Sequence, residues 1–243
     1  MDKPKSNLTA ASAVRTAHWQ DVYGSKAETQ LSWFEASPAL SLELMAEAGF
    51  AVGLPAPGHS GAATGATARG AAVIDTAVID IGGGVSRLVD ELLRRGYRAL
   101  SVLDISAAAL QTVRQRLARD AALRAAAAGV TWIAADVTRW RPDRPYDLWH
   151  DRAALHFLTD PADQQAYRSV IAAALQPGGI AIIGTFAPDG PERCSNLPVQ
   201  RHDADSLAHL LGPGFELLAA RRHDHVTPWG AVQHFQFSTF RRR

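Results

Sequence analysis

The stretch Val78-Ile79-Asp80-Ile81-Gly82-Gly83-Gly84-Val85-Ser86 joins an apolar, β-branched run to a cluster of glycines. Residues 73–81 are expected to form a short buried strand, and the amphipathic segment 86–95 predicts a helix directly after it. Glycines let the backbone approach a ligand closely, and the first turn of a helix has free N–H groups. This order of strand, tight turn and helix is typical of a site for a nucleoside cofactor.

Asp104 supplies the second part of this prediction. It follows the apolar run 99–103 and lies 20 residues after Gly84. A carboxylate at such a strand tip suits the hydroxyl groups of a ribose. The dinucleotide pattern Gly-x-Gly-x-x-Gly is poorly met, because Arg87 stands at the third glycine position counted from Gly82. The sequence therefore favours a nucleoside cofactor that is not a dinucleotide.

The pattern Asp80-x-Gly82-x-Gly84-x-Ser86 resembles the first motif of class I S-adenosylmethionine (SAM) methyltransferases. Further segments follow in the order of that family. Asp136-Val137 comes after the apolar run 130–134, the stretch 146–150 resembles the fourth strand, and Leu175-Gln176-Pro177-Gly178-Gly179 precedes the apolar run 180–186. The resemblance covers about residues 15–243. It implies a methyltransferase enzyme with SAM as its cofactor.

The resemblance also implies roles for single residues. The glycine loop would pass the methionine part of SAM and Asp80 would help to hold its ammonium group. Asp104 would take the ribose, Asp136 the adenine amino group, and the next backbone N–H a ring nitrogen. The expected cofactor-binding residues are Asp80, Gly82, Gly83, Gly84, Asp104, Ile105, Asp136, Val137, Asp151, Trp19 and Trp33.

Candidate catalytic residues come after the fourth expected strand, where open α/β sheets place their ligands. Asp151 and His156 are the candidates, with a helix cap and a structural histidine as the respective alternatives. Cys194 follows the fifth strand and is a candidate neighbour of the acceptor, with an inert cysteine as the alternative. No metal is expected, since no Cys/His spacing for zinc is present.

Two resemblances bear on the methyl acceptor. Asp151-Arg152-Ala153-Ala154-Leu155 and the tryptophan-rich N-terminal segment resemble thiopurine, thiol and halide methyltransferases. Trp19-x-x-x-Tyr23 and Ser32-Trp33 also resemble protein-lysine methyltransferases of the elongation-factor and citrate-synthase type. Aromatic faces over the cofactor suit its cationic sulfonium. We expect a small-molecule acceptor such as a thiol or another soft nucleophile. A protein-lysine methyltransferase and a non-catalytic SAM-binding subunit are the alternatives.

The expected fold is α/β, with strands alternating with helices from residue 73 onward. The resemblance implies a Rossmann-like, seven-stranded methyltransferase sheet that ends in an antiparallel hairpin over 215–222 and 231–240. We expect a disordered start at 1–11, a helical cap at 12–52, a flexible Gly/Ala linker at 53–72 and the SAM-binding domain at 73–243. Further helices are predicted at 107–118, 162–175 and 204–211.

Composition limits the classes of function. The chain has 243 residues, 47% of them hydrophobic, and a net charge of +1. These values fit one globular domain and argue against a nucleic-acid partner, which would need clustered excess Lys and Arg. The single cysteine excludes an internal disulfide and suits a reducing cytoplasm. No apolar run reaches the ~20 residues that span a bilayer, so we expect no membrane partner. The oligomeric state is left open.

Overall fold

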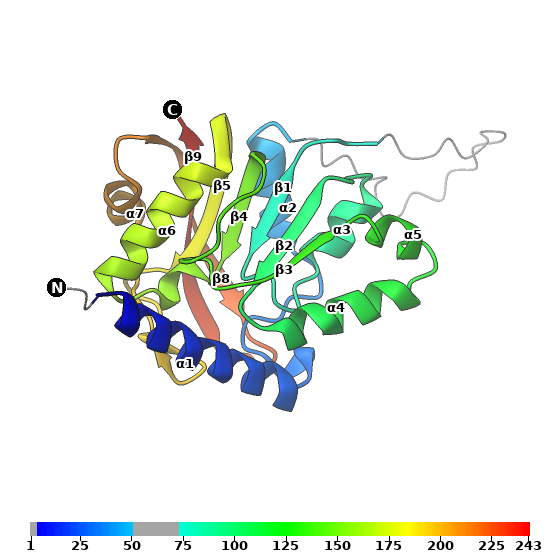
Figure 1. Ribbon diagram of the computed structural model, residues 1–243, viewed down its shortest axis with the longest axis horizontal. Helices are drawn as coiled ribbons and strands as arrows, with labels where there is room; N and C mark the ends of the chain where they lie inside the picture. The colour runs from blue at the N-terminus through cyan, green and yellow to red at the C-terminus, as the bar shows by residue number, and fades with distance from the viewer. Residues whose placement is uncertain (1–3, 51–72) are drawn as a thin grey trace.

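A computed structural model describes residues 4–50 and 73–243, with side chains from residue 12 onward. Its main feature is a seven-stranded sheet in the order β3-β2-β1-β4-β5-β9-β8 (Figure 1). The first five strands of that order run parallel, and β9 is antiparallel to both β5 and β8. The predicted Rossmann-like sheet with a final antiparallel hairpin is therefore confirmed. The strands are β1 (Val78–Ile81), β2 (Leu100–Asp104), β3 (Thr131–Ala134), β4 (Tyr146–Arg152), β5 (Leu175–Phe186), β8 (Phe215–Val226) and β9 (Val232–Arg242).

Several strands differ in length from the prediction. β1 begins at Val78 instead of residue 73, because Val73 is exposed and Ile74 makes only an isolated bridge to Tyr97. The final hairpin is longer than expected, and its strands pair as far as Val226 and Val232. A separate small hairpin, β6 (Arg193–Cys194) and β7 (Leu197–Pro198), lies in the connection after β5.

Helices cover both faces of the sheet (Figure 1). On one face, Met45, Leu88 and Val113 bring α2, α3 and α4 into a shared apolar core. On the other face, Tyr167 and Leu207 bring α6 and α7 into a second core. The helices are α2 (Ala39–Glu47), α3 (Leu88–Arg94), α4 (Ala107–Arg119), the short α5 (Arg124–Ala127), α6 (Pro161–Ala174) and α7 (Ala204–Leu211). The predicted helices are thus present, within one or two residues at most ends.

The N-terminal helix α1 (Pro4–Ser25) lies across the sheet edge where the parallel strands end (Figure 1). It begins inside segment 1–11, so the predicted disorder there was wrong from Pro4 onward. Proline suits the first helical turn, and the alanine-rich sequence that follows has high helix propensity. The predicted linker 53–72 lies outside the described residues. Within the described residues, no helix is both long and apolar enough to cross a membrane.

Candidate active site

Two adjoining cavities open at the carboxyl ends of the parallel strands, as expected for an open α/β sheet. They share Gly82, Trp33 and Arg152. The first cavity lies between α1 and the tips of β2 and β3, and the second lies between the glycine loop and the start of α2. The first is lined by Arg15, Trp19, Tyr23, Trp33, Ile81, Gly82, Leu103, Asp104, Ile105, Ala135, Asp136, Val137, Arg152, Ala153, Ala154, Phe157, Leu158 and Cys194.

The glycine loop needs its glycines for both conformation and space. Gly82 and Gly84 have positive φ values of 62° and 48°, which other residues rarely adopt. A Cβ on Gly82 would lie 2.6 Å from the Cβ of Ala154, and one on Gly83 would lie 2.5 Å from Cγ1 of Val102. The loop therefore lies tightly against the neighbouring strand tips, and Gly82 and Gly83 line the second cavity.

Asp104 lines the first cavity from the tip of β2, with Ile105 beside it. Its two carboxylate oxygens accept hydrogen bonds from the backbone N–H groups of Gly84 (2.8 Å) and Ser106 (2.7 Å). Burial raises the pKa of Asp104 to about 7, although both hydrogen bonds favour the ionised form. The predicted ribose carboxylate is thus held by the loop whose spacing predicted it.

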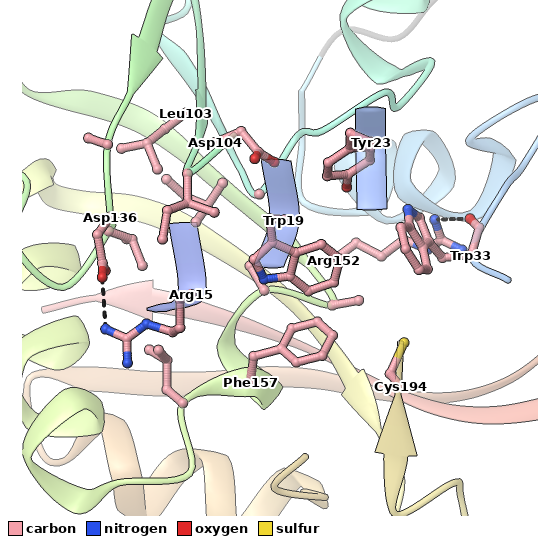
Figure 2. Close-up of a pocket in the computed structure, with 18 residues that line it drawn as sticks. Arg15, Trp19, Tyr23, Trp33, Leu103, Asp104, Asp136, Arg152, Phe157 and Cys194 are labelled. Atoms are coloured by element: carbon pink, nitrogen blue, oxygen red, sulfur yellow. Dashed lines mark hydrogen bonds and ion pairs between the residues drawn. The ribbon is translucent and has the colours of Figure 1, made fainter. Parts of the chain in front are cut away.

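Asp136 and Val137 line the same cavity after β3. Oδ2 of Asp136 pairs with Nη2 of Arg15 at 2.7 Å, and Arg15 also pairs with Asp163 on α6 (Figure 2). Burial raises the pKa of Asp136, but hydrogen bonds from Arg15, Ser12 and Thr138 outweigh burial and leave the pKa below its usual value. Arg15, which the sequence reading missed, therefore ties α1 to the acid expected at the adenine.

Aromatic side chains form the wall of the first cavity (Figure 2). The ring of Trp19 on α1 lies 4.9 Å from Phe157, 5.8 Å from Trp33 and 5.9 Å from Tyr23, measured between centroids. Trp19 itself is buried. Trp19 and Trp33 thus lie at the site where the sequence predicted them, and Phe157, in a short 3-10 turn (Leu155–Phe157), completes the wall.

Asp80 ends up in the second cavity, buried at the tip of β1. Its Oδ1 lies 2.7 Å from Nδ1 of His150, and Nε2 of His150 lies 2.9 Å from Oγ of Ser41. Its Oδ2 is buried and has no hydrogen-bond partner. An orphaned carboxylate oxygen beside the glycine loop is a natural acceptor for a ligand's ammonium group.

Arg152, at the end of β4, is the most important cavity residue that the sequence reading did not single out. It lines both cavities, its Nη2 lies 2.9 Å from Oε1 of Glu35, and its Nη1 donates to the carbonyl oxygen of Trp33 at 3.0 Å. Burial lowers the pKa of Arg152, and the charges of Glu35 and Asp80 oppose that shift. This buried cation therefore sits where the cavities meet.

Asp151 and His156, the predicted catalytic residues, line neither cavity. Asp151 is fully buried, and its carboxylate accepts from the N–H groups of Ala154 and Leu155 and from the hydroxyl of Tyr167 at 2.7 Å. Burial raises its pKa to about 6. His156 is also fully buried, its Nδ1 faces the N–H of Phe186, and burial lowers its pKa to about 3. In this structure Asp151 caps the turn that follows β4, and His156 supports the end of β5, so neither predicted side chain reaches the cavities.

Cys194 does lie at the cavity, as the sequence suggested, and burial raises the pKa of its thiol to about 11. The histidines of the final hairpin have carboxylate neighbours: His225 lies 3.6 Å from Glu35 and His234 lies 2.7 Å from Asp224. Among residues 4–50 and 73–243, no group of three or more His, Cys, Asp or Glu is arranged to hold a metal.

A family model described as "Methyltransferase domain" matches residues 78–179. Solved structures with the same fold span most of this chain. One, described as "Conversion of a Disulfide Bond into a Thioacetal Group during Echinomycin Biosynthesis", is 20% identical over 93% of this chain and 92% of its own, with a TM-score of 0.66. Burkholderia thailandensis 1,6-didemethyltoxoflavin-N1-methyltransferase is 20% identical over 100% and 91%, with a TM-score of 0.62. No curated protein sequence matches the chain.

The domain match covers the glycine loop, Asp104, Asp136 and β4, which are the parts that build the two cavities. N-methyltransferase NodS from Bradyrhizobium japonicum WM9, solved with S-adenosylhomocysteine, shares the fold at 15% identity over 69% of this chain and 78% of its own, with a TM-score of 0.53. Residues 78–179 thus match a methyltransferase domain, and the chain has the fold of class I, SAM-dependent methyltransferases.

The residues present fit SAM on the structure's own observations. The glycine loop lies so close to its neighbours that no Cβ fits there, and the free Oδ2 of Asp80 lies beside Gly83. Asp104 at the first cavity suits the ribose, and the aromatic wall suits a sulfonium cation. The methionine end would therefore lie in the second cavity and the adenosine end in the first.

Proposed function

We propose that this protein transfers the methyl group of SAM to a small molecule, with a thiol or a comparably soft nucleophile as the acceptor. SAM supplies an electrophilic methyl group when it is bound. The protein's own residues bind and orient the two reactants and exclude water from the cavity. One observation carries the choice of acceptor: apart from Asp104, which we assign to the ribose of SAM, the titratable residues that line the first cavity are poor proton acceptors at neutral pH.

Each titratable residue that lines the first cavity is either already engaged in polar contacts or in the wrong protonation state to accept a proton. Asp136 is paired with Arg15, and Asp104 already accepts two backbone hydrogen bonds. Burial raises the pKa of Cys194 to about 11 and that of Tyr23 well above its usual value, so neither is ionised at neutral pH. A thiol acceptor, with a pKa of about 8.5, is partly ionised without help, whereas an alkyl ammonium at about 10.4 needs a base.

The wall itself supports a small acceptor. Trp19, Tyr23, Trp33 and Phe157 present flat apolar faces that suit an aromatic or apolar molecule. The structural relatives include a protein described by the conversion of a disulfide into a thioacetal and an N1-methyltransferase of a small heterocycle. One description names sulfur chemistry and the other an N1-methyltransferase, so the state of the wall residues supports our choice of a soft acceptor.

The experiment has two stages. Calorimetric titration with SAM, S-adenosylhomocysteine and NAD should give saturable binding of the first two ligands only. Methyl-labelled SAM is then incubated with a matched series in which one aromatic ring carries a thiol, a hydroxyl or an aminomethyl group. We expect the thiol to be methylated fastest near pH 7, because a larger fraction of it than of the other two groups is in the nucleophilic form there.

Other outcomes point elsewhere. Faster labelling of the aminomethyl compound, or of lysines in added proteins, would overturn the thiol assignment and return the protein-lysine alternative. Saturable SAM binding with no transfer to any acceptor would favour a non-catalytic subunit. Binding of NAD alone would overturn the cofactor.

A further inference from the structure

A chain of three polar side chains runs from the helical cap to the floor of the second cavity. Ser41 lies in the first turn of α2, His150 lies near the end of β4, and Asp80 is the last residue but one of β1. Oγ of Ser41 is 2.9 Å from Nε2 of His150, and Nδ1 of His150 is 2.7 Å from Oδ1 of Asp80. All three residues line the second cavity, and each is at most 4% exposed.

The donor and acceptor roles in this chain follow from the Asp80 carboxylate. A carboxylate can only accept, so Nδ1 of His150 carries the proton that is donated to Asp80. In a neutral ring Nε2 is then an acceptor, and it accepts a hydrogen bond from the hydroxyl of Ser41. This arrangement engages Oδ1 of Asp80 and leaves Oδ2 of the same carboxylate without a partner. A Cβ on Gly83 would lie 2.9 Å from that oxygen, so it faces the glycine loop.

The same order of groups activates a serine in many hydrolases. Here the free atom is at the opposite end of the chain. Ser41 is only 2% exposed and its hydroxyl is engaged by His150, whereas the unpartnered atom is on Asp80. The geometry therefore orients the carboxylate and does not expose the serine.

We propose that Ser41 and His150 are positioning residues for the methionine end of SAM. They fix the Asp80 carboxylate so that its free oxygen faces the cofactor's ammonium group, and they thereby connect the cap helix α2 to cofactor binding. This inference rests on the proposed function. It adds that a serine outside the matched methyltransferase domain, which begins at residue 78, tunes the affinity for one half of the cofactor.

The test compares ligands that have or lack the amino-acid end. SAM and S-adenosylhomocysteine both carry it, and 5′-methylthioadenosine does not. Loss of one hydrogen bond in the chain that holds the Asp80 carboxylate costs on the order of 1 kcal/mol. Ser41→Ala should therefore weaken the binding of SAM and S-adenosylhomocysteine about fivefold. His150→Gln should weaken them by about tenfold or more, since Asp80 loses its direct partner. 5′-Methylthioadenosine should bind all proteins within about twofold of each other.

Two variants separate positioning from general damage. Ser41→Thr keeps the hydroxyl and should retain near wild-type affinity for SAM. Ser101→Ala removes another buried serine, which accepts from Tyr146 outside both cavities, and should change none of the affinities. As a readout independent of ligands, proton NMR of the free wild-type protein should show a strongly downfield-shifted His150 Nδ1–H signal that His150→Gln abolishes.

The proposal is overturned if Ser41→Ala and His150→Gln bind SAM as the wild type does, or if they weaken 5′-methylthioadenosine equally. A wild-type protein that binds none of the three ligands would instead contradict the proposed function, so the two failures are distinct.

Discussion

The two halves of the site are held in different ways. In the adenosine half, Asp104 is fixed by backbone N–H groups 20 residues earlier and 2 residues later in the chain. In the methionine half, Asp80 depends on His150, 70 residues away, and His150 on Ser41, 109 residues away. The first half is built largely by local backbone geometry and the second by side chains brought together by the fold. Substitutions in the two halves should therefore have different consequences.

The largest expected effect is in the half built by side chains. Arg152→Met leaves the Glu35 carboxylate, which is 21% exposed, without its guanidinium partner. Breaking such a partly buried pair should lower the free energy of unfolding by about 3 kcal/mol. Urea denaturation measures this loss. The double variant Glu35→Gln/Arg152→Met removes both charges and should recover most of it; a double variant as unstable as the single one would mean that lost packing, not the unpaired charge, is the cause.

In the adenosine half, which is held by backbone hydrogen bonds, a substitution should mainly affect ligand binding. Asp104→Ala removes the carboxylate that we assign to the ribose and should weaken SAM binding by about 1–3 kcal/mol. Calorimetric titration measures the change, and 5′-methylthioadenosine should lose as much affinity as SAM because it keeps the ribose. Unchanged affinity would contradict the ribose assignment, whereas a loss confined to SAM would transfer Asp104 to the methionine half.

The pH dependence sharpens the role of Asp104. Its pKa of about 7 lies above the ordinary value of 3.8, so ionisation of Asp104 in the free protein costs stability as pH rises toward 7. Ribose hydroxyls donate to the ionised form, so SAM binding should release a proton below pH 7. Affinity should then rise by up to about tenfold per pH unit between pH 5 and 7 and level off above. Asp104→Asn should remove this dependence; its persistence in that variant would assign it to another group.

The same contrast explains what could be predicted from the sequence. Asp80, the glycine loop, Asp104 and Asp136 follow strand tips at fixed spacings, and the structure places them all at or beside the two cavities. The spacing could not reveal the contacts of Asp80, because Ser41 and His150 are far from it in sequence. Arg15 was missed for the same reason, since it lies 121 residues from Asp136.

The predicted catalytic residue Asp151, near the end of β4, lies away from the cavities for a simple geometric reason. Successive side chains on a strand point to opposite faces of the sheet. His150 and Arg152 therefore share the face that lines the cavities, whereas Asp151 points to the other face and meets Tyr167 on α6. The resemblance in this segment drew attention to the acid. Alternation, counted from the Asp80–His150 pairing in the sheet, would have pointed to Arg152.

The smallest expected effect concerns the ion pair between Arg15 and Asp136 in the adenosine half. Arg15→Gln removes the ion pair that holds α1 to Asp136, and at pH 7 it should lower the free energy of unfolding by about 1 kcal/mol. The pKa of Asp136 is below its usual value in the folded protein. The stabilisation it brings is therefore present above the ordinary carboxylate pKa and is lost as pH falls through the lowered one. The difference between wild type and variant should begin to shrink below about pH 4, where the carboxylate becomes protonated first in the unfolded chain and, at lower pH, in the folded protein. Urea denaturation at pH 7 and pH 3 measures both values. A difference of the same size at pH 3 would mean that Arg15 holds α1 through its aliphatic packing and not through the ion pair.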